Sequence, residues 1–274
     1  MIKSLIILIV ALVLAPCFKA QATRKGTVLK DSLYAPQLGY TKGIWIYLPP
    51  NYDFAKQRYP VLYLQDAQNL FDRNTSYSGE WGIDETMDSL YFKKKPMAII
   101  VGIEHGGENR INELTPFPHP KYKGGQGKAY LDFITNSLKP HIDKNYRTKT
   151  KKRHTYIGGS SLGGLISTFA LGYSNDYFSK ALVFSPAYWI NLQPLVSFIS
   201  SSRNCHYSRK SLYIIQGLNE SSTIEKDTRE VVQHLQNNGL KRKNTAILSD
   251  PNGVHNENFW RSEFARAYLW LWSL

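Results

Sequence analysis

The residues of this sequence best suited to chemistry lie in the glycine-rich stretch Gly158–Gly164, where a serine has small neighbours on both sides. The pattern G-x-S-x-G is centred on Ser161, between the strand-like run His154–Ile157 and the helix-like run Leu165–Leu171. Glycines two residues before and after a serine permit a very tight turn that exposes the hydroxyl at the start of a helix. The positive end of that helix stabilises an oxyanion. The pattern therefore predicts a nucleophilic serine. A turn with only a packing role and Ser160 as nucleophile are the alternatives, and the spacing favours Ser161.

A nucleophilic serine needs a histidine base, and the loop Asp250–Asn256 supplies a candidate in His255. This loop lies between the last expected strand and the last expected helix, so it opens at the same sheet edge as Ser161. His105 also follows a strand, but it precedes the serine, whereas this kind of turn is followed by an acid and then a histidine. We therefore favour His255 as base and leave His105 a role beside the substrate. The other histidines are interpreted as surface residues.

The acid that orients the base is expected between the serine and the histidine in the chain. Glu220 is the first acidic residue after the strand-like run Leu212–Gln216. Asp227 falls inside the next expected helix, and Asp250, after the next strand, is the second candidate. Burial beside the histidine would keep Glu220 ionised and hold the imidazole in one tautomer.

The elements that must position these side chains alternate between strands and helices. The expected strands are Ile44–Leu48, Pro60–Leu64, Met97–Ile103, His154–Ile157, Lys180–Phe184, Leu212–Gln216 and Thr245–Leu248. Several of these runs are apolar throughout, which is typical of strands buried on both faces of a parallel sheet. Between them, apolar residues recur at helical spacing. This alternation predicts an α/β fold, a mostly parallel sheet with helices on both faces.

Prolines and glycines indicate where the helices stop. Pro140 must kink or divide a helix whose apolar stripe runs from Leu131 to Ile142, and Gly239 ends another. The prolines and glycines within 104–127 argue against a helix there. We expect this segment to be a loop over the carboxyl edge of the sheet, where α/β folds bind ligands.

Composition excludes several classes of protein. The chain has 274 residues, of which 42% are hydrophobic and 20% charged, so it is neither disordered nor a coiled coil. Two cysteines, Cys17 and Cys205, cannot build a disulfide scaffold or a cysteine-rich metal site. Residues 1–22, with Lys3, an apolar run and an Ala-Gln-Ala site, read as a signal peptide cleaved after Ala22 rather than as a membrane or lipid anchor. We therefore expect a secreted or periplasmic protein, with residues 23–274 as one domain.

The formal net charge of +13 comes largely from three basic clusters, Lys93–Lys95, Arg147–Arg153 and Lys241–Lys243. Each cluster precedes an expected strand, which puts it at the amino edge of the sheet, opposite Ser161. The clusters are therefore not expected to steer an anionic substrate to the serine. No basic segment is interleaved with aromatic residues, so nucleic acid is not an expected partner. A solvated surface is the favoured interpretation, and attraction to an anionic polysaccharide or the cell envelope is a hypothesis.

Five motifs in order resemble the esterase D and enterochelin esterase-like family of α/β-hydrolases. They are Pro60–Asp72, Gly158–Gly164, Ser185–Trp189, Gly217–Glu220 and Gly253–Asn256, and they span nearly the whole mature chain. This family includes feruloyl and acetyl-xylan esterases, siderophore esterases, S-formylglutathione hydrolase and mycolyltransferases. The resemblance implies an α/β-hydrolase fold and a serine esterase that uses Ser161, Glu220 and His255.

The resemblance also implies roles for residues around the serine. An oxyanion hole would use the backbone N–H groups of Leu162 and of Ala67 or Gln68, although relatives often have glycine in place of Ala67. Arg110, which opens an Arg-x-x-Glu segment, would form a structural ion pair at the rim of the substrate pocket, and Trp189 would be a pocket wall. Neither a metal nor an organic cofactor is required. The expected function is hydrolysis of esters on carbohydrates or siderophores. An acyltransferase, or an inactive glycan- or siderophore-binding protein with this fold, is the alternative.

Overall fold

A single mixed sheet organises the computed structural model, which describes residues 25–202 and 205–273. The strands are β1 (Thr27–Ala35), β2 (Tyr40–Leu48), β3 (Val61–Gln65), β4 (Ile99–Ile103), β5 (Thr155–Ser160), β6 (Lys180–Phe184), β7 (Ser211–Gly217) and β8 (Thr245–Asp250). They pair in the order β1-β2-β4-β3-β5-β6-β7-β8. Strands β3 to β8 run parallel, and β1 and β2 form an antiparallel hairpin whose second strand pairs antiparallel with β4. The carboxyl ends of six neighbouring strands therefore meet at one edge.

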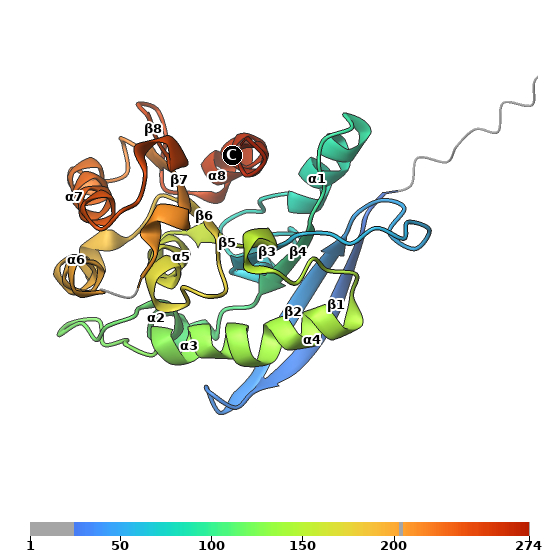
Figure 1. Cartoon of the computed structure of the whole chain (residues 1–274), viewed down its shortest axis with the longest axis horizontal. Helices are drawn as coiled ribbons and strands as arrows, with labels where there is room; N and C mark the ends of the chain where they lie inside the picture. The colour runs from blue at the N-terminus through green and yellow to red at the C-terminus, as the bar shows by residue number, and fades with distance from the viewer. Residues whose placement is uncertain (1–24, 203–204, 274) are drawn as a thin grey trace, which may run out of the picture.

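Helices cover both faces of the sheet. They are α1 (Ile83–Phe92), α2 (Arg110–Leu114), α3 (Gly127–Phe133), α4 (Lys139–Asn145), α5 (Leu162–Tyr173), α6 (Leu192–Ser201), α7 (Ile224–Asn237) and α8 (Glu257–Trp270). Short turns of 3₁₀-helix include η1 (Ala67–Asn69) and η5 (Tyr188–Ile190). In Figure 1, α1 and α8 lie on one side of the sheet, and α3, α5 and α6 lie on the other, with α7 beside α6.

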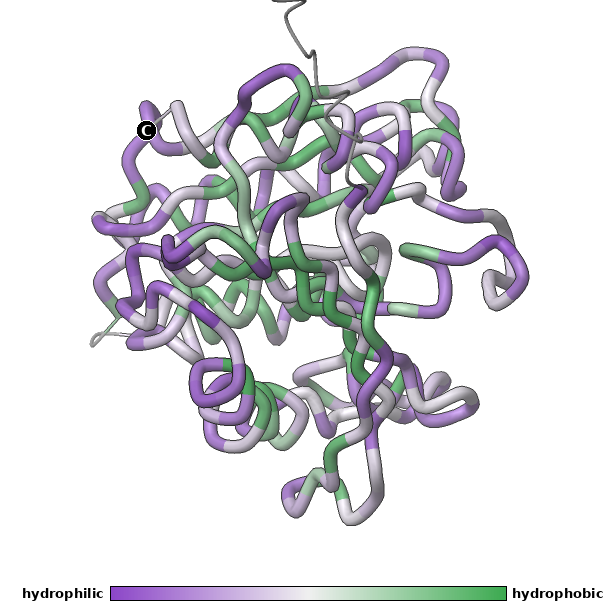
Figure 2. The backbone as a smooth tube through the Cα atoms, turned by 90° about the vertical axis from the view of Figure 1, so that its right-hand side faces the viewer, coloured by the Kyte–Doolittle hydropathy of each residue, from purple (hydrophilic) through white to green (hydrophobic). Residues whose placement is uncertain are grey.

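Each face of the sheet has its own hydrophobic core. Side chains of α3, α5, α6 and α7 fill one core, where Phe169 and Leu235 are completely buried. Helices α1 and α8 fill the other, where Met87 and Phe264 are completely buried. The central strands β3, β4 and β7 are buried along their whole length, as expected for strands covered on both faces. Figure 2 shows the same arrangement, with hydrophobic segments inside and hydrophilic ones around them.

The structure confirms the predicted α/β class and the seven predicted strands, with shifts of a few residues at their ends. It adds β1, which sequence analysis missed because this edge strand is mostly exposed and lacks an apolar pattern. Pro140 falls in the first turn of α4, and the five residues of π-helix Ile134–Leu138 separate this helix from α3. The proline thus divides the helix as predicted.

The prediction that 104–127 contains no helix is wrong, because it includes α2. The prolines lie after this helix, beginning at Pro116, so they limit its length without preventing it. The proposed signal peptide, residues 1–22, lies outside the described residues. Within the part of the chain that the structure describes, no helix is both long and apolar enough to cross a membrane.

Candidate active site

Ser161 lies on a strained turn between β5 and α5, directly before the first residue of the helix. Its backbone adopts φ 56° and ψ −119°, a conformation that side-chain-bearing residues rarely adopt. Backbone hydrogen bonds hold the turn: the Ser161 N–H donates to the carbonyl of Phe184 on the next strand (2.9 Å). The Ser161 carbonyl accepts from the amides of Gly164 and Leu165 (both 3.1 Å) and of Ala187 (3.0 Å). The turn projects the serine from the carboxyl edge of the sheet, as a nucleophile elbow does.

Glu220 and His255, predicted from separate parts of the sequence, are hydrogen-bonded to each other. Nδ1 of His255 lies 2.8 Å from Oε2 of Glu220. The carboxylate side chain is 1% exposed, whereas the imidazole is 42% exposed. Glu220 Oε1 also accepts the backbone N–H of Gly217 (2.6 Å), so the carboxylate is held by β7 and directs its second oxygen to the ring. A buried acceptor on Nδ1 leaves Nε2 of His255 as the basic nitrogen that faces solvent.

The loops that carry these two residues are bound to each other along their backbones. The amide of Leu218 donates to the carbonyl of Asp250 (2.9 Å), and that of Asn219 donates to Gly253 (3.2 Å). A Cβ on Gly217 would lie 2.2 Å from the backbone of Gly253, so neither position has room for a side chain. This close approach brings together the acid after β7 and the histidine after β8.

Ser185 and Trp260 complete the support for the acid. Ser185 Oγ donates to Glu220 Oε1 (2.6 Å) and accepts the indole N–H of Trp260 (2.8 Å). The Trp260 ring also packs edge-on against His255, with 5.0 Å between the ring centroids. The sequence pattern indicated Ser185 only as the first residue of a family motif and gave Trp260 no role in the site. The role of Ser185 depends on the order of the strands. Because β6 lies between β5 and β7, the residue that follows β6 lies between the ends of those two strands.

The strand order places the serine at the same edge of the sheet as this pair. Ser161 follows β5, Ser185 follows β6 and Glu220 follows β7, and these strands are consecutive neighbours in the sheet. Neighbouring strands are about 4.8 Å apart, so the ends of β5 and β7 are separated by roughly 10 Å, which an imidazole can bridge. Among the described residues, neither the Ser161 hydroxyl nor Nε2 of His255 takes part in a hydrogen bond. Both groups are therefore open to a substrate, and such contacts often tighten only when one binds.

Backbone N–H groups suited to an oxyanion flank the serine. Within residues 25–202 and 205–273, the amides of Leu162 and Ala67 donate to no protein acceptor. Leu162 begins α5, and Ala67 begins η1 directly after β3, the neighbour of β5 in the sheet. Gln68, the other predicted donor, is the next residue of η1, and its side chain exchanges two hydrogen bonds with the backbone of His105.

Two ion pairs, one partly buried and one fully buried, hold α2 and connect it to the residue before Ala67. Asp66 has a left-handed backbone conformation, with φ 62°. Its carboxylate accepts hydrogen bonds from both Nε (2.7 Å) and Nη2 (2.8 Å) of Arg110. Glu113, one turn along α2, pairs instead with Lys42 of β2 at 2.6 Å and accepts the hydroxyl of Tyr40. The ion-pair interpretation of the Arg-x-x-Glu segment thus holds, with two separate partners from β2 and the end of β3.

The remaining predicted pocket residues lie in the segments above the sheet edge. His105 follows β4, and its Nδ1 accepts the amide of Gly107 (3.0 Å). Partial burial lowers the pKa of His105, which favours a neutral ring. Trp189, in η5, is 53% exposed and meets the ring of Tyr122 edge-on at 5.4 Å. Through this contact, the segment 104–127 packs against the segment that follows β6.

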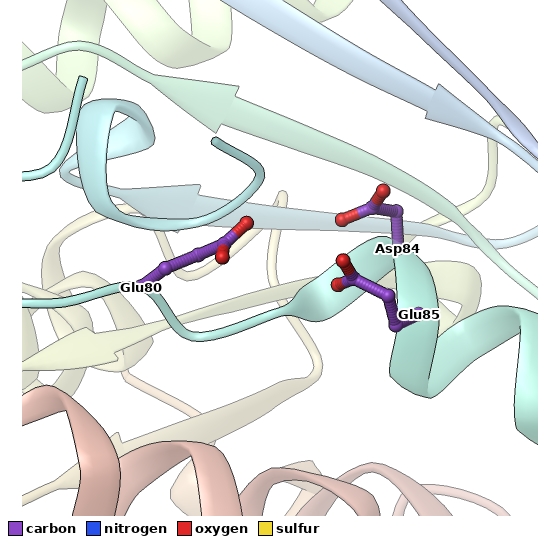
Figure 3. Close-up of side chains that lie close together, drawn as sticks. All are labelled: Glu80, Asp84 and Glu85. Atoms are coloured by element: carbon purple, nitrogen blue, oxygen red, sulfur yellow. The ribbon is translucent and has the colours of Figure 1, made fainter. Parts of the chain in front are cut away.

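One acidic cluster at the start of α1 has the composition of a cation site. Figure 3 shows Glu80, Asp84 and Glu85 with their carboxylates directed toward one another, and their ligand atoms lie within 4.8 Å. Burial and the charge of Glu85 raise the pKa of Asp84 to about 7. Glu80 precedes α1, whereas Asp84 and Glu85 lie in its first turn. Within the described residues, none of the three is hydrogen-bonded or ion-paired to Ser161, Glu220 or His255.

Comparison with known proteins identifies the family of this fold. The sequence matches the family described as "Putative esterase" over residues 35–271. The chain belongs to this esterase family. Its fold resembles that of a solved ferulic acid esterase, with a TM-score of 0.70 at 20% identity over 90% of this chain and 98% of the other. The fold class implied by the sequence motifs is thus confirmed.

Three relatives with curated names extend the comparison. The uncharacterized protein YbbA of Bacillus subtilis is 28% identical over 89% of this chain and 97% of its own length. An endo-1,4-beta-xylanase/feruloyl esterase of Xylanibacter ruminicola is 27% identical over 51% of this chain but only 19% of its own length. A siderophore triacetylfusarinine C esterase of Aspergillus fumigatus is 26% identical over 58% of this chain and 56% of its own length.

Proposed function

We propose that this protein is a serine esterase that acts through an acyl-enzyme, with Ser161 as nucleophile, His255 as base and Glu220 as the orienting acid. The observation that carries the proposal is the Glu220–His255 hydrogen bond at the same sheet edge as the strained turn of Ser161. Membership of the esterase family supports the same reaction class. No other described group combines an exposed imidazole with a buried carboxylate partner.

In the proposed reaction, Nε2 of His255 removes the proton from the Ser161 hydroxyl as the oxygen attacks the ester carbonyl. The oxyanion accepts hydrogen bonds from the amides of Leu162 and Ala67. Because these amides donate to no other acceptor among the described residues, no existing hydrogen bond has to break. The protonated imidazole returns its proton to the departing alcohol, and the acyl group stays on Ser161. Water, activated by the same imidazole, then releases the carboxylic acid. Buried Glu220 stabilises the imidazolium at each stage.

The substrate class follows from the relatives. One relative is named as an esterase of feruloyl groups and another as an esterase of a siderophore, and we propose that this chain cleaves an ester of a carbohydrate or a siderophore. The exposed ring of Trp189 and its contact Tyr122 offer an apolar wall for such a substrate. We also propose export, based on the pattern in residues 1–22, which mass measurement of the mature protein from culture medium or periplasm would test.

The sharpest test of the mechanism is a pre-steady-state burst with p-nitrophenyl acetate. Wild type should release one equivalent of p-nitrophenol rapidly, because this activated ester acylates the serine faster than water removes the acetyl group. Ser161→Ala and His255→Ala should abolish the burst, with kcat reduced by about 10⁴-fold or more. Ser160→Ala is the matched control, because it removes the adjacent hydroxyl and should keep the burst. A burst that survives Ser161→Ala, or disappears with Ser160→Ala, contradicts the assignment.

A substrate panel separates the classes of ester. Purified protein is assayed against methyl ferulate, acetylated xylan and a catecholate triester, with product analysis in the presence and absence of a sugar acceptor. We expect free carboxylic acid as the product from at least one of these esters. An acylated sugar as the main product would identify a transferase instead.

A further inference from the structure

The edge of the sheet opposite Ser161 gathers three segments that are far apart in the sequence. Arg58–Pro60 leads into β3, Lys93–Met97 into β4, and Lys149–His154 into β5. Because β4, β3 and β5 are consecutive parallel neighbours, their amino ends lie side by side. Backbone bonds join the segments, since Lys149 N–H donates to the carbonyl of Tyr59 (2.7 Å) and Ile99 N–H to that of Pro60 (3.0 Å).

These segments line two adjoining hollows that share Arg58 and Lys149. One hollow, of about 570 Å³, lies between the segments before β3 and β4, and the other, of about 640 Å³, between those before β3 and β5. Together they are lined by six Lys and Arg residues: Arg58, Lys94, Lys95, Lys149, Lys151 and Arg153. No Asp or Glu lines either hollow. The two hollows adjoin at Arg58 and Lys149, and we refer to them together as the cationic groove.

Within the described residues, no carboxylate is paired with the lysines of this groove. Among the described residues, the ammonium groups of Lys94, Lys95, Lys149 and Lys151 make no ion pair or hydrogen bond, and all four side chains are exposed. Two carboxylates in or next to elements that precede β5 or β6 have partners other than these lysines. Asp143 binds Lys139 and Thr148, and Asp176 faces Lys152. The neighbouring cations Lys149, Lys151 and Arg153 contribute to the lowered pKa of His154, whose first cause is burial.

Aromatic side chains give the groove an apolar surface beside its charges. The hollow between the segments before β3 and β4 is also lined by Tyr91, Phe92 and Trp272, and Phe92 is half exposed. Sugar rings pack on such surfaces, while cations bind the acidic groups that the sugars carry. The volume of each hollow is in the range of ordinary ligand sites.

We propose that this groove binds an anionic polysaccharide, one whose sugars carry carboxylate or sulfate groups. This inference rests on the proposed function, because an esterase acting on polymer-linked esters gains from being held on its substrate. The groove and Ser161 lie at opposite ends of parallel strands that are five or six residues long, which corresponds to about 17 to 20 Å. The groove would therefore hold the enzyme on a polysaccharide chain. The part of the chain bound in the groove would not be the part that reaches Ser161.

The test measures binding independently of catalysis. Full-length mature protein carrying Ser161→Ala is titrated at low salt with labelled polygalacturonate, neutral dextran and single-stranded DNA of similar length. We expect binding to polygalacturonate that weakens steeply with added salt, weaker binding to DNA, and none to dextran. Using the Ser161→Ala background separates this test from the esterase test, because neither result depends on turnover.

Paired variants locate the site. Lys95→Gln/Lys149→Gln removes two unpaired charges of the groove, and Lys241→Gln/Lys243→Gln removes two exposed charges from the segment before β8, three strands away. We expect about a tenfold loss of affinity from the first pair, since two exposed ion contacts are lost, and less than twofold from the second. Equal losses from both pairs, tighter binding of DNA, or no binding to polygalacturonate at low salt would each overturn the proposal.

Discussion

At the scale of single residues, the site depends on the hydrogen-bond donors that hold the buried carboxylate of Glu220. Glu220 accepts Ser185 Oγ and the amide of Gly217 on one oxygen and faces His255 with the other. The donors fix the direction of the carboxylate, and the carboxylate fixes the ring of His255. His255, although 42% exposed, can therefore keep a single orientation.

The first prediction concerns Ser185. Ser185→Ala removes a hydrogen bond to the charged Glu220 and leaves the buried indole N–H of Trp260 without its acceptor. We expect kcat on p-nitrophenyl acetate to fall about tenfold, because a hydrogen bond to a charged group contributes about 1.5–3 kcal/mol, with little change in KM. Trp260→Phe, which keeps the ring packing on His255 but loses only the N–H, should reduce kcat less. A Ser185→Ala enzyme with unchanged kcat would show that Gly217 alone orients the acid.

The second prediction uses the carboxylate cluster at the start of α1. The pKa of Asp84 is raised by burial and by Glu85 to about 7, against 3.8 in an unfolded chain. Between these values the folded state holds a proton that the unfolded state has lost, so the stabilisation from this group decreases as pH rises from 4 to 7. Asp84→Asn should make urea stability less dependent on pH in this window and relatively greater at pH 8. Asp53→Asn, an exposed carboxylate without a partner in the described residues, should leave the dependence unchanged.

At the scale of elements, two loops after neighbouring strands have to lie in contact for the site to exist. Gly217 ends β7 and Gly253 lies in the turn after β8, and their backbones approach more closely than any Cβ allows. Each strand end brings one functional side chain, and the contact between the loops sets the distance between them. Glycine at these two positions is therefore a requirement of the site rather than of the fold.

The third prediction follows from this contact. In Gly253→Ala the new Cβ would lie 2.6 Å from Gly217 Cα and 2.8 Å from the ring of Phe259, so the loops must separate. We expect kcat to fall by about a hundredfold, because an error of about 1 Å in catalytic geometry has effects of this size. The control is Gly239→Ala at the end of α7, where φ is +105° and strain lowers stability away from the site. If both variants lose activity only in proportion to their stability, the contact has no catalytic role.

At the scale of the whole molecule, the β1–β2 hairpin is joined to the segment above the site by a buried ion pair. Lys42 of β2 and Glu113 of α2 are 2% and 0% exposed. Burial lowers the pKa of Lys42, and the charge of Glu113 opposes that effect. The antiparallel edge of the sheet thereby supports α2, and through α2 the Arg110–Asp66 pair beside Ala67.

The fourth prediction tests that link. Lys42→Met leaves Glu113 as a buried carboxylate without its cation and should lower the free energy of unfolding by about 3–5 kcal/mol. The double variant Lys42→Met/Glu113→Gln removes the uncompensated charge and should regain part of the loss. Urea unfolding measures both. A single variant as stable as wild type, or a double variant less stable than the single one, would show that the pair does not hold the hairpin to α2.

The sequence by itself determined what depends on local pattern. Apolar runs flanked by turns predicted seven strands, and the spacing of glycines around Ser161 predicted the elbow, because both follow from constraints within a few residues. The sequence also indicated Glu220 and His255, because each of them follows an expected strand. It failed at β1, which has no buried face to impose a pattern, and at α2, which is too short for helical spacing to be visible.

Only the tertiary structure decided which distant residues meet. The order of strands in the sheet put Ser185 between the ends of β5 and β7, and packing on the sheet brought Trp260 to it. The partners of Arg110 and Glu113 come from β3 and β2, which no spacing within the chain specifies. The cationic groove likewise exists because β4, β3 and β5 are neighbours. Contacts between segments far apart in the chain depend on strand order and packing. Neither can be derived from a sequence pattern that extends over only a few residues.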